Sequence, residues 1–276
     1  MSYIIVGGSQ RSGTSIMQQL LCQLPEANPY LYEASFLREL VTVYSQGRNN
    51  FDRNHDSYFA SVQSVRDFMS GVVHAFVEQA ARHVGAKEHL ILKEPHLTMY
   101  WPFLFELLPE AWFVLMIRDP RDVIASMVKV GERQKQVGVE SVFTLRDIPT
   151  LCKHFQDFYR LTFDFKNQSF RDRLGIVLYE DLAREPKATL KQLADFTGVP
   201  FDSIDPTAEP RPSLVDADVI RTDRMYSPWA TEVSGAKLAA NRVGNYRNVL
   251  EPHEIAQVEQ HCGDFLQTFG YLAHAA

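Results

Sequence analysis

Short apolar runs recur along the chain and predict a set of buried strands. Four of them are nearly continuous in apolar residues, which is typical of parallel strands covered on both faces; they lie at residues 3–6, 89–92, 112–117 and 175–179. Residues 29–32 form a shorter and weaker run, and we expect a fifth strand there.

Between these runs, apolar residues recur at the spacing of an amphipathic helix. The predicted helices cover residues 12–24, 62–84, 97–108, 120–130, 186–196 and 251–269. Proline lies in the first turn of the helices that begin at 120 and 186, where it is tolerated, and Gly198 is placed to end the second of them. Strands that alternate with helices predict βαβ units, and therefore an α/β fold with a mostly parallel central sheet flanked by helices, in a single domain over residues 1–276.

Two polar stretches interrupt this alternation. Residues 47–55 (GRNNFDRNH) are predicted to form a loop. Residues 202–235 contain four prolines and many polar side chains. Because a loop of that length in a compact domain is usually functional or mobile, we expect it to be a lid or substrate loop over the functional site.

Composition narrows the class of protein. The 276 residues are 45% hydrophobic and 22% charged, which is ordinary for a soluble globular protein, and the net charge of -6 argues against broad nucleic-acid binding. No apolar run approaches the roughly 18–20 residues of a membrane span. The first strand begins almost at residue 1, so we expect neither a membrane segment nor a signal peptide.

The spacing of the cysteines and histidines bears on the cellular compartment and on metal binding. The three cysteines lie far apart without metal-binding spacing, which predicts buried, reduced thiols in the cytoplasm: Cys22, Cys152 and Cys262. The nine histidines are scattered, so no metal site is expected.

Residues 7–15, GGSQRSGTS, follow the first predicted strand and open the first predicted helix. Gly8 and Gly13 have the G-x-x-x-x-G spacing of a phosphate-binding P-loop, which aims backbone N–H groups and the helix dipole at one anion. A nucleotide hydrolase or kinase has Lys next, but Thr14 stands there, and the cation of the stretch is Arg11. The fold is therefore predicted to be a P-loop-like three-layer α/β fold whose loop binds phosphate or sulfate through arginine. The alternative is an ordinary tight turn with a surface arginine.

The segment IVGGSQRSGTSIMQQLL, together with FVLMIRDPRDVIASMV, resembles the PAPS-dependent sulfotransferase family, whose donor is 3′-phosphoadenosine 5′-phosphosulfate (PAPS). The likeness extends over most of the chain as five motifs in the same order. It is strongest for the branch with R-S-G-T-[ST], which includes tyrosylprotein sulfotransferases and many bacterial enzymes. The resemblance implies a donor-binding loop with these members: Arg11, Ser12, Gly13, Thr14 and Ser15.

The resemblance also implies residues for the nucleotide part of the donor. Arg118 and Ser126 correspond to the pair that binds the 3′-phosphate, and Arg242 and Gly244, in NRVGNYRN, are expected to close on the same phosphate. Tyr179, in the Y-E-D-L turn, is expected near the adenine. The alternatives are an ion pair between Arg118 and a nearby aspartate, packing roles for Ser126 and Tyr179, and a plain surface loop at the C-terminal motif.

Two further motifs supply the residues expected at the transferring group. Lys93, in LILKEPH, matches a K-[DE]-P motif whose lysine contacts that group in the similar enzymes. Glu33 lies in the region of the general base, which removes the proton of the acceptor hydroxyl. His96 is the second candidate base, because its K-x-x-H spacing is one residue longer than the K-x-H of the cytosolic branch. The alternatives are a Lys93–glutamate salt bridge and a helix-start role for Glu33.

These expectations combine into a metal-independent sulfotransferase that moves a sulfo group from PAPS to a hydroxyl or amine by in-line transfer. Arg11, Glu33 and Lys93 are predicted to be catalytic. The acceptor is predicted to be a small molecule, with neither nucleic acid nor a membrane as partner. Two alternatives remain: a magnesium-dependent small-molecule kinase, which needs lysine where Thr14 stands, and a non-catalytic nucleotide-binding module, against which the three predicted catalytic residues argue.

Overall fold

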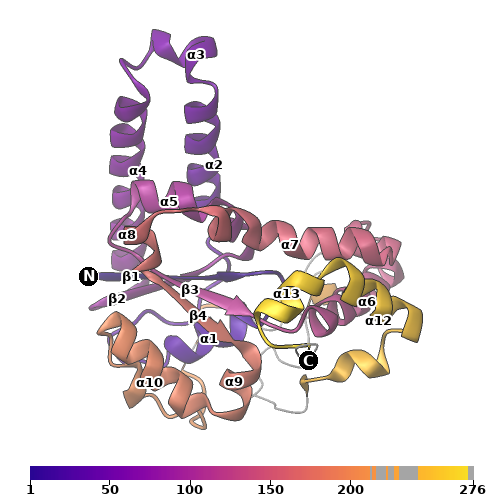
Figure 1. Cartoon of the computed structure of the whole chain (residues 1–276). Helices are drawn as coiled ribbons and strands as arrows, with labels where there is room; N and C mark the ends of the chain where they lie inside the picture. Colours follow the sequence, from indigo (N-terminus) through magenta and orange to yellow (C-terminus); the bar gives the residue numbers. More distant parts are fainter. Residues whose placement is uncertain (212, 216–221, 223–226, 230–241, 273–276) are drawn as a thin grey trace.

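A four-stranded parallel sheet forms the centre of the molecule (Figure 1). The structure is a computed structural model, and it describes residues 1–211, 213–215, 222, 227–229 and 242–272. The strands have the order β2-β1-β3-β4, and their bounds are β1 Ser2–Gly8, β2 His89–Lys93, β3 Trp112–Ile117 and β4 Leu174–Leu178. All four strands that the apolar runs predict are present.

Helices cover both faces of the sheet, so the predicted three-layer α/β arrangement is confirmed. One face carries α1 (Thr14–Leu21), α9 (Tyr179–Arg184) and α10 (Pro186–Thr197). The other face carries a larger set: α2 (Ser35–Asn49), α4 (Val62–Val84), α5 (Trp101–Leu107), α6 (Pro120–Gln136) and α7 (Ile148–Asp164). Each face has its own apolar core, which explains why the strands are apolar at nearly every position.

The remaining elements are short. The α-helices are α3 (Phe51–Asn54), α8 (Gln168–Arg171), α12 (Pro252–His261) and α13 (Gly263–Thr268). The 3₁₀ turns are η1 (His55–Ser57), η2 (Pro95–Tyr100), η3 (Val142–Leu145), η4 (Phe201–Ser203), η5 (Ser227–Trp229) and η7 (Asn245–Asn248). The predicted end of α10 is correct, because Gly198 adopts the left-handed conformation directly after it.

The predicted strand at residues 29–32 is wrong. This segment runs beside the edge strand β2 without extending the sheet, apart from an isolated bridge between Ala27 and His89. The reason is the buried side chain of Asn28, whose oxygen accepts from the Ile91 amide at 2.6 Å and whose nitrogen donates to the Ile91 carbonyl at 3.1 Å. An amide side chain thus occupies the place of a strand backbone.

The predicted loop at residues 47–55 is also wrong, because most of it is helical in α2, α3 and η1. Gly47 lies inside α2, buried where the helix meets α4; a β-carbon at this position would lie 3.6 Å from the Val65 side chain. The glycine therefore serves close helix packing here and does not end the helix. Helices α2 and α7 were not predicted at all.

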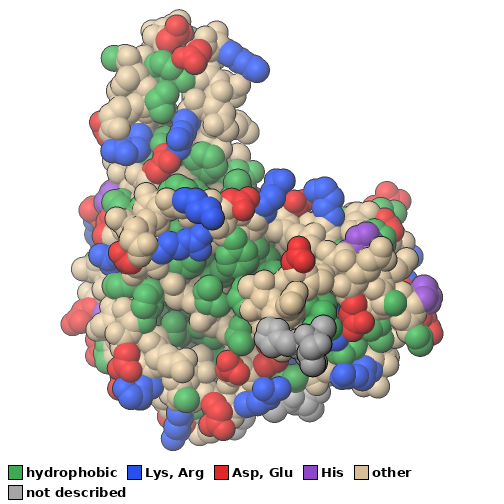
Figure 2. Space-filling view, in the orientation of Figure 1, with side chains coloured by type: hydrophobic (Ala, Val, Ile, Leu, Met, Phe, Trp, Pro, Cys, Tyr) green, Lys and Arg blue, Asp and Glu red, His purple; other side chains and the backbone are tan. Residues whose placement is uncertain are grey.

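Helices α2 and α4 form a long hairpin that projects from the body of the molecule (Figures 1 and 2). At the start of α4, Ser61 and Ser64 form a reciprocal capping box. The base of the hairpin is held to the body by the side chain of Glu106 in α5, which accepts from both Tyr44 and Arg48 of α2.

Because parallel strands all end at the same edge of a sheet, the residues that end them lie together. The register pairs Val6 with Lys93 and Ile117 with Leu178. The glycine loop after β1, Lys93, Arg118 after β3 and Tyr179 after β4 therefore share the carboxyl edge of the sheet. This edge is where the predicted site residues are found.

Candidate functional site

The glycine loop joins β1 to α1 in a conformation that only certain residues adopt easily. Gly8 and Gly13 have φ angles of 133° and 100°, and Arg11 has a φ of 71° although it carries a side chain. Ser12 closes a turn by donating from both its amide and its hydroxyl to the Ser9 carbonyl. A left-handed arginine inside such a loop is the kind of local strain that is found at ligand sites.

The start of α1 presents unpaired donors. Gly13 is its N-cap and supplies no capping side chain, and we find no acceptor in the described part of the chain for the amides of Thr14 and Ser15. The Thr14 side chain is buried, whereas Ser15 is exposed. The first N–H groups of a helix, together with its dipole, favour an anion at this position.

Positive charge gathers beside these amides. Arg11 donates from Nε to the Ser126 hydroxyl at 3.1 Å, and Arg118 donates from Nη1 to the Arg11 carbonyl at 3.2 Å. Burial, followed by the charges of Arg133, Arg118 and Arg242, lowers the pKa of Arg11 to about 10. Burial and repulsion from the other three guanidinium groups thus both disfavour the charge of Arg11, and a bound anion would relieve the repulsion.

Arg118 lies on the ring of Tyr179, with 4.3 Å between the guanidinium carbon and the ring centre. Both side chains are almost completely buried, and the Arg118 Nε and the Tyr179 hydroxyl have no hydrogen-bond partner in the described ranges. The Tyr179 ring also lies against Gly13, where a β-carbon would approach it to 2.6 Å. The structure thus places Tyr179 beneath the loop and leaves two buried polar atoms there without partners.

The C-terminal motif folds over the start of α6. The Arg242 carbonyl accepts from Arg118 Nη2 at 3.1 Å, so the two predicted phosphate ligands are neighbours. The amides of Gly244 and Tyr246 both donate to the carboxylate of Asp122 at 2.8 Å. Because Asp122 takes the Gly244 amide, that backbone group is already occupied in this conformation. The alternative of an Arg118–aspartate pair is also present, as an ion pair with Asp122 in which 3.8 Å separates Nη2 from Oδ2.

Lys93 and Glu33 lie in direct contact. Lys93 Nζ donates to Glu33 Oε1 at 2.8 Å; the lysine side chain is 5% exposed and the glutamate 49%. The Ala34 amide also donates to the Lys93 carbonyl, which fixes the segment that carries Glu33 against the end of β2. The charge of Glu33 acts on Arg11 as well, so the three predicted catalytic residues form one electrostatic group.

His96 is paired with a different glutamate. Its Nδ1 lies 3.3 Å from Glu94 Oε1, and its amide donates to the same oxygen at 3.0 Å. Burial raises the pKa of Glu94, but the hydrogen bond and charge of His96 outweigh burial and lower it overall. Glu94, which completes the K-[DE]-P motif, therefore orients His96 and leaves Lys93 to Glu33.

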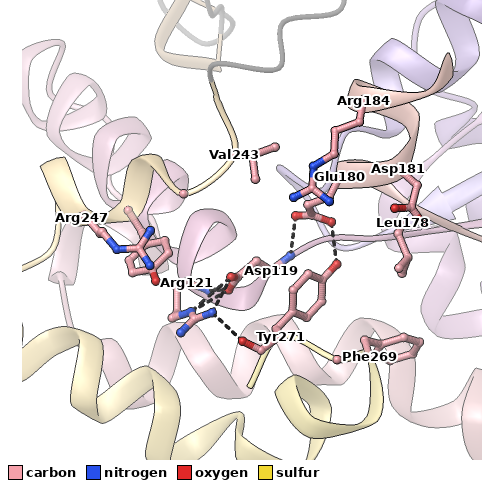
Figure 3. Close-up of a pocket in the computed structure, with 13 residues that line it drawn as sticks. Asp119, Arg121, Leu178, Glu180, Asp181, Arg184, Val243, Arg247, Phe269 and Tyr271 are labelled. Carbon is pink, nitrogen blue, oxygen red and sulfur yellow. Dashed lines mark hydrogen bonds and ion pairs between the residues drawn. The ribbon is translucent and has the colours of Figure 1, made fainter. Parts of the chain in front are cut away.

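Asp119, the residue after Arg118, lies in a group of polar contacts with Arg121, Glu180 and Tyr271 (Figure 3). Arg121 forms an ion pair with Asp119, with 2.8 Å between Nη2 and Oδ2. Glu180 accepts from the Asp119 amide at 3.1 Å and from the Tyr271 hydroxyl at 2.6 Å. These groups line a pocket of about 320 Å³. Asp119 is thus engaged by arginine, and across the described ranges no cluster of three or more His, Cys, Asp or Glu side chains could hold a metal ion.

The sequence analysis did not identify two residues that support the glycine loop, nor a third, basic residue near Arg11. Thr98 accepts from the Gly8 amide at 2.8 Å, and the Tyr159 hydroxyl accepts from the Ser9 amide at 3.0 Å. Arg133 lies seven residues after Ser126, on the same face of α6, and donates to the Pro228 carbonyl at 2.8 Å. The spacing of seven residues between Ser126 and Arg133 is the only one of these features that the sequence could have indicated. The contacts of Thr98 and Tyr159 join segments that are distant in the sequence.

Half of the predicted lid at residues 202–235 lies outside the described residues. The described turn η5 sits against the site, where the Trp229 carbonyl lies 3.4 Å from Arg11 Nη1. In the described ranges no helix combines the length and the apolar composition that a bilayer crossing needs.

A parallel α/β sheet with a glycine loop, unpaired helix-start amides and clustered arginines at its carboxyl edge defines a class of anion-binding, P-loop-like proteins. Residues 3–203 match the family model described as "Sulfotransferase family". Since this match covers most of the chain, the protein belongs to the sulfotransferase family, as the two long motifs predicted.

Individual relatives agree with this assignment. A putative protein-tyrosine sulfotransferase of Caenorhabditis briggsae is 28% identical over 202 residues, which cover 72% of this chain and 66% of the relative. The chain spans from half to just under two thirds of the length of this and two other nematode relatives.

Solved structures share the fold. The sulfotransferase domain from the curacin biosynthetic pathway superposes with a TM-score of 0.55 at 15% identity, covering 96% of this chain and 97% of that one. Mouse sulfotransferase SULT7A1, solved in complex with PAP, has a TM-score of 0.54 at 11% identity, covering 96% and 84% of the two chains.

Proposed function

We propose that this protein transfers a sulfo group from PAPS to a hydroxyl of an acceptor, leaving 3′-phosphoadenosine 5′-phosphate (PAP). The observation that carries the proposal is the group of arginines at the glycine loop. Arg11, Arg118 and Arg133 donate to a serine hydroxyl and to backbone carbonyls, while the carboxylate nearest Arg118 lies 3.8 Å away. A group of arginines held mainly by neutral hydrogen-bond acceptors fits a ligand that carries several negative charges, such as PAPS.

The donor fits this edge of the sheet in a definite direction. The unpaired amides at the start of α1 would receive the 5′-phosphosulfate, next to Arg11 and Lys93. Arg118, Ser126 and Arg242 would hold the 3′-phosphate, and the partnerless hydroxyl of Tyr179 supplies a polar atom near the adenine. The PAP complex of the mouse structure is consistent with this class of donor.

The Lys93–Glu33 contact gives the transfer a plausible geometry. Glu33, half exposed, would take the proton of the acceptor hydroxyl as its oxygen attacks sulfur. Lys93 and Arg11 would stabilise the negative charge that develops on the bridging oxygen as the bond between that oxygen and sulfur breaks. His96 is less suited to the role of base, because Glu94 already holds its Nδ1.

Two features count against magnesium-dependent phosphoryl transfer. Thr14 stands at the lysine position of the loop, and Asp119, the carboxylate nearest the end of β3, forms an ion pair with Arg121. A hydroxyl acceptor agrees with the name of the nematode protein-tyrosine sulfotransferase, although a small-molecule acceptor remains our own prediction from the sequence.

Isothermal titration and a transfer assay test the proposal together. We expect PAP to bind with micromolar or tighter affinity without metal, and ATP with magnesium to bind far more weakly. Tight binding of ATP with magnesium and none of PAP would contradict the donor assignment. If PAP binds but labelled sulfate from PAPS is not transferred to any of a panel of phenols, sugars and tyrosine peptides, the non-catalytic module would be the better description.

A further inference from the structure

The α2–α4 hairpin carries nearly half of the exposed large hydrophobic side chains in the described ranges. Of the eleven exposed large hydrophobic side chains in the described ranges, five lie on the hairpin: Phe36, Val43, Tyr58, Val62 and Phe68. Exposed apolar side chains that are scattered singly are ordinary, whereas a contiguous group on one projecting element indicates a contact surface. The proposed sulfo transfer uses none of them.

Phe36, Val43 and Phe68, together with half-buried apolar neighbours, follow the helical repeat. On α2 the apolar positions stand at intervals of four and three residues, at Phe36, Leu40 and Val43, and on α4 they are Phe68 and Val72. The stripe continues to Phe76, whose ring lies 5.3 Å from that of Phe36 and joins the two helices. We call these positions, with Gly71 and Ala75 between them, the apolar stripe.

The stripe has small residues beside its largest projection. Gly71 is exposed, and a β-carbon built there would lie in open space, with no atom within 4 Å. Ala75 is exposed one turn further along, while Phe68 projects with 58% of its surface exposed. If a second α4 packs antiparallel with its centre at Gly71 and Val72, then Phe68 of each copy falls opposite Ala75 of the other. Large therefore meets small on both sides of a two-fold axis.

Charge favours a second copy over other partners. The hairpin, residues 35–84, contains five arginines and five carboxylates, so it is neutral within a chain whose net charge is -6. A neutral face does not repel its own copy, and it lacks the excess of basic residues that draws amphipathic helices to anionic membranes. A convex face of two helices also provides no groove for a single alkyl chain.

The size of the face is adequate for a dimer. At 1.5 Å per residue, the 23 residues of α4 span about 34 Å. Two helices with an axis separation of about 10 Å present a face about 20 Å wide. The product is about 700 Å² per copy, close to the ~800 Å² that each partner contributes to a stable interface.

We propose that the apolar stripe is a homodimer interface, in which the α2–α4 hairpins of two copies pack face to face about a two-fold axis near Gly71. This assembly is independent of the donor site. It covers the projecting aromatic side chains with the same side chains of the second copy.

Sedimentation velocity over about 1–100 µM protein tests the proposal, a range that spans weak and tight dimers. We expect the wild type to be dimeric and Phe68→Glu to be monomeric, because the substitution places two carboxylates in the interface. Ile176→Glu, at an exposed apolar residue on β4 outside the hairpin, is the matched control and should remain dimeric. Circular dichroism of all three proteins checks that the fold is intact.

A second variant separates the interface from the fold. Gly71→Gln replaces the glycine with a good helix former whose long side chain would stand in the interface, so it should raise the melting temperature of the monomer while weakening the dimer by about tenfold or more. A wild type that stays monomeric at every concentration overturns the proposal. A dimer that Phe68→Glu and Gly71→Gln leave unchanged also overturns it, as does a monomer that binds liposomes through Phe68.

Discussion

Arg11 combines two costs at one residue. Its φ of 71° is unfavourable for a side chain with a β-carbon, and burial, followed by the charges of neighbouring arginines, lowers its pKa to about 10. Because the folded pKa lies below that of the unfolded chain, the charged form is disfavoured on folding. This cost is present below about pH 10 and is relieved as the pH rises through that value. Such a residue is better explained by ligand binding than by stability.

We therefore expect Arg11→Asn to separate function from stability. Asparagine tolerates the left-handed conformation and carries no charge, so unliganded protein at pH 7 should be as stable as the wild type or more stable by up to about 1 kcal/mol. PAP affinity should fall about ten- to a hundredfold. Urea denaturation and titration calorimetry measure the two effects. A strongly destabilised variant that binds PAP normally would make Arg11 a structural residue.

Glu33→Gln should reduce turnover by about 10²–10⁴-fold while PAP affinity stays nearly unchanged, because glutamine keeps the shape but accepts no proton. The matched control is His96→Asn, which removes the other candidate base and should have a much smaller effect. Steady-state kinetics with PAPS and one acceptor, beside calorimetry with PAP, give both numbers. The roles are reversed if His96→Asn is the inactive variant.

Arg118→Ala should mainly weaken donor binding. Arg118 donates to the carbonyls of Arg11 and Arg242, so its loss removes a cation and also loosens two neighbouring segments. The loss of one charge-assisted contact to phosphate corresponds to about 1.5–3 kcal/mol, or roughly ten- to a hundredfold in PAP affinity. Unchanged affinity in calorimetry would restrict Arg118 to packing on Tyr179.

Which site residues could be predicted follows from where they lie in the sequence. Lys93 and Arg118 directly follow apolar runs, and Arg11 lies in the loop after the first run. The common edge of a parallel sheet therefore brings the three residues together. The sequence offered a salt bridge between Lys93 and a glutamate only as an alternative and did not identify Glu33 as the partner, because the two residues are 60 positions apart. The supporting contacts of Thr98 and Tyr159 were not predictable, since each joins residues at least 90 positions apart.

At the scale of elements, α6 and η3 meet at a glycine. A β-carbon on Gly131 would lie 2.1 Å from the backbone carbonyl oxygen of Phe143, and a backbone atom cannot move aside as a side-chain tip can. Helix α6 also carries Ser126 and Arg133, so the same contact positions the site. The glycine is thus required by packing, in contrast to the unobstructed Gly71 in α4.

We expect Gly131→Ala to destabilise the protein by about 1–3 kcal/mol, as overpacking in a core does. Gly71→Ala is the matched control, because both residues are inside helices; it should stabilise by about 0.5–1 kcal/mol. Chemical denaturation of both variants measures the difference. Equal effects of the two substitutions would contradict the close approach at Gly131.

The helices that were missed show what the apolar pattern could not reveal. The last turn of helix α2 lies in the polar stretch that begins at Gly47, and a glycine among polar residues is typical of a loop. In the structure, Gly47 is helical and packs closely against Val65 of α4. The strand predicted at residues 29–32 was apolar enough, but Asn28 takes the hydrogen bonds that such a strand would make. Both errors arose because a tertiary contact outweighed the local preference.

At the scale of the whole molecule, ligand binding should couple to stability. PAP would neutralise the repulsion among the arginines, so it should raise the melting temperature, with about 2.7 kcal/mol of stabilisation at a hundredfold excess over its dissociation constant. Differential scanning calorimetry with PAP, and with sulfate at the same ionic strength as control, measures this. A rise no larger than that with sulfate would show that the nucleotide is not recognised.

The surface of the molecule carries acidic and basic side chains in mixture on the face shown in Figure 2. The group of arginines at the glycine loop is a local feature of the sheet edge. Cytoplasmic location and a small-molecule acceptor both stay predictions, since they depend on parts of the sequence argument that the fold does not test.

The irregular segment of residues 26–34, which runs beside the edge strand β2, affects how the protein behaves at high concentration. Outward-facing backbone groups of an edge strand can pair with the same strand of another molecule and so begin a fibril. Here the His89 amide donates to the Glu26 carbonyl, Asn28 takes both groups of Ile91, and the Lys93 carbonyl accepts from Ala34. An irregular segment thus seals this rim of the sheet against cross-molecular growth, and a single carboxamide protects its middle.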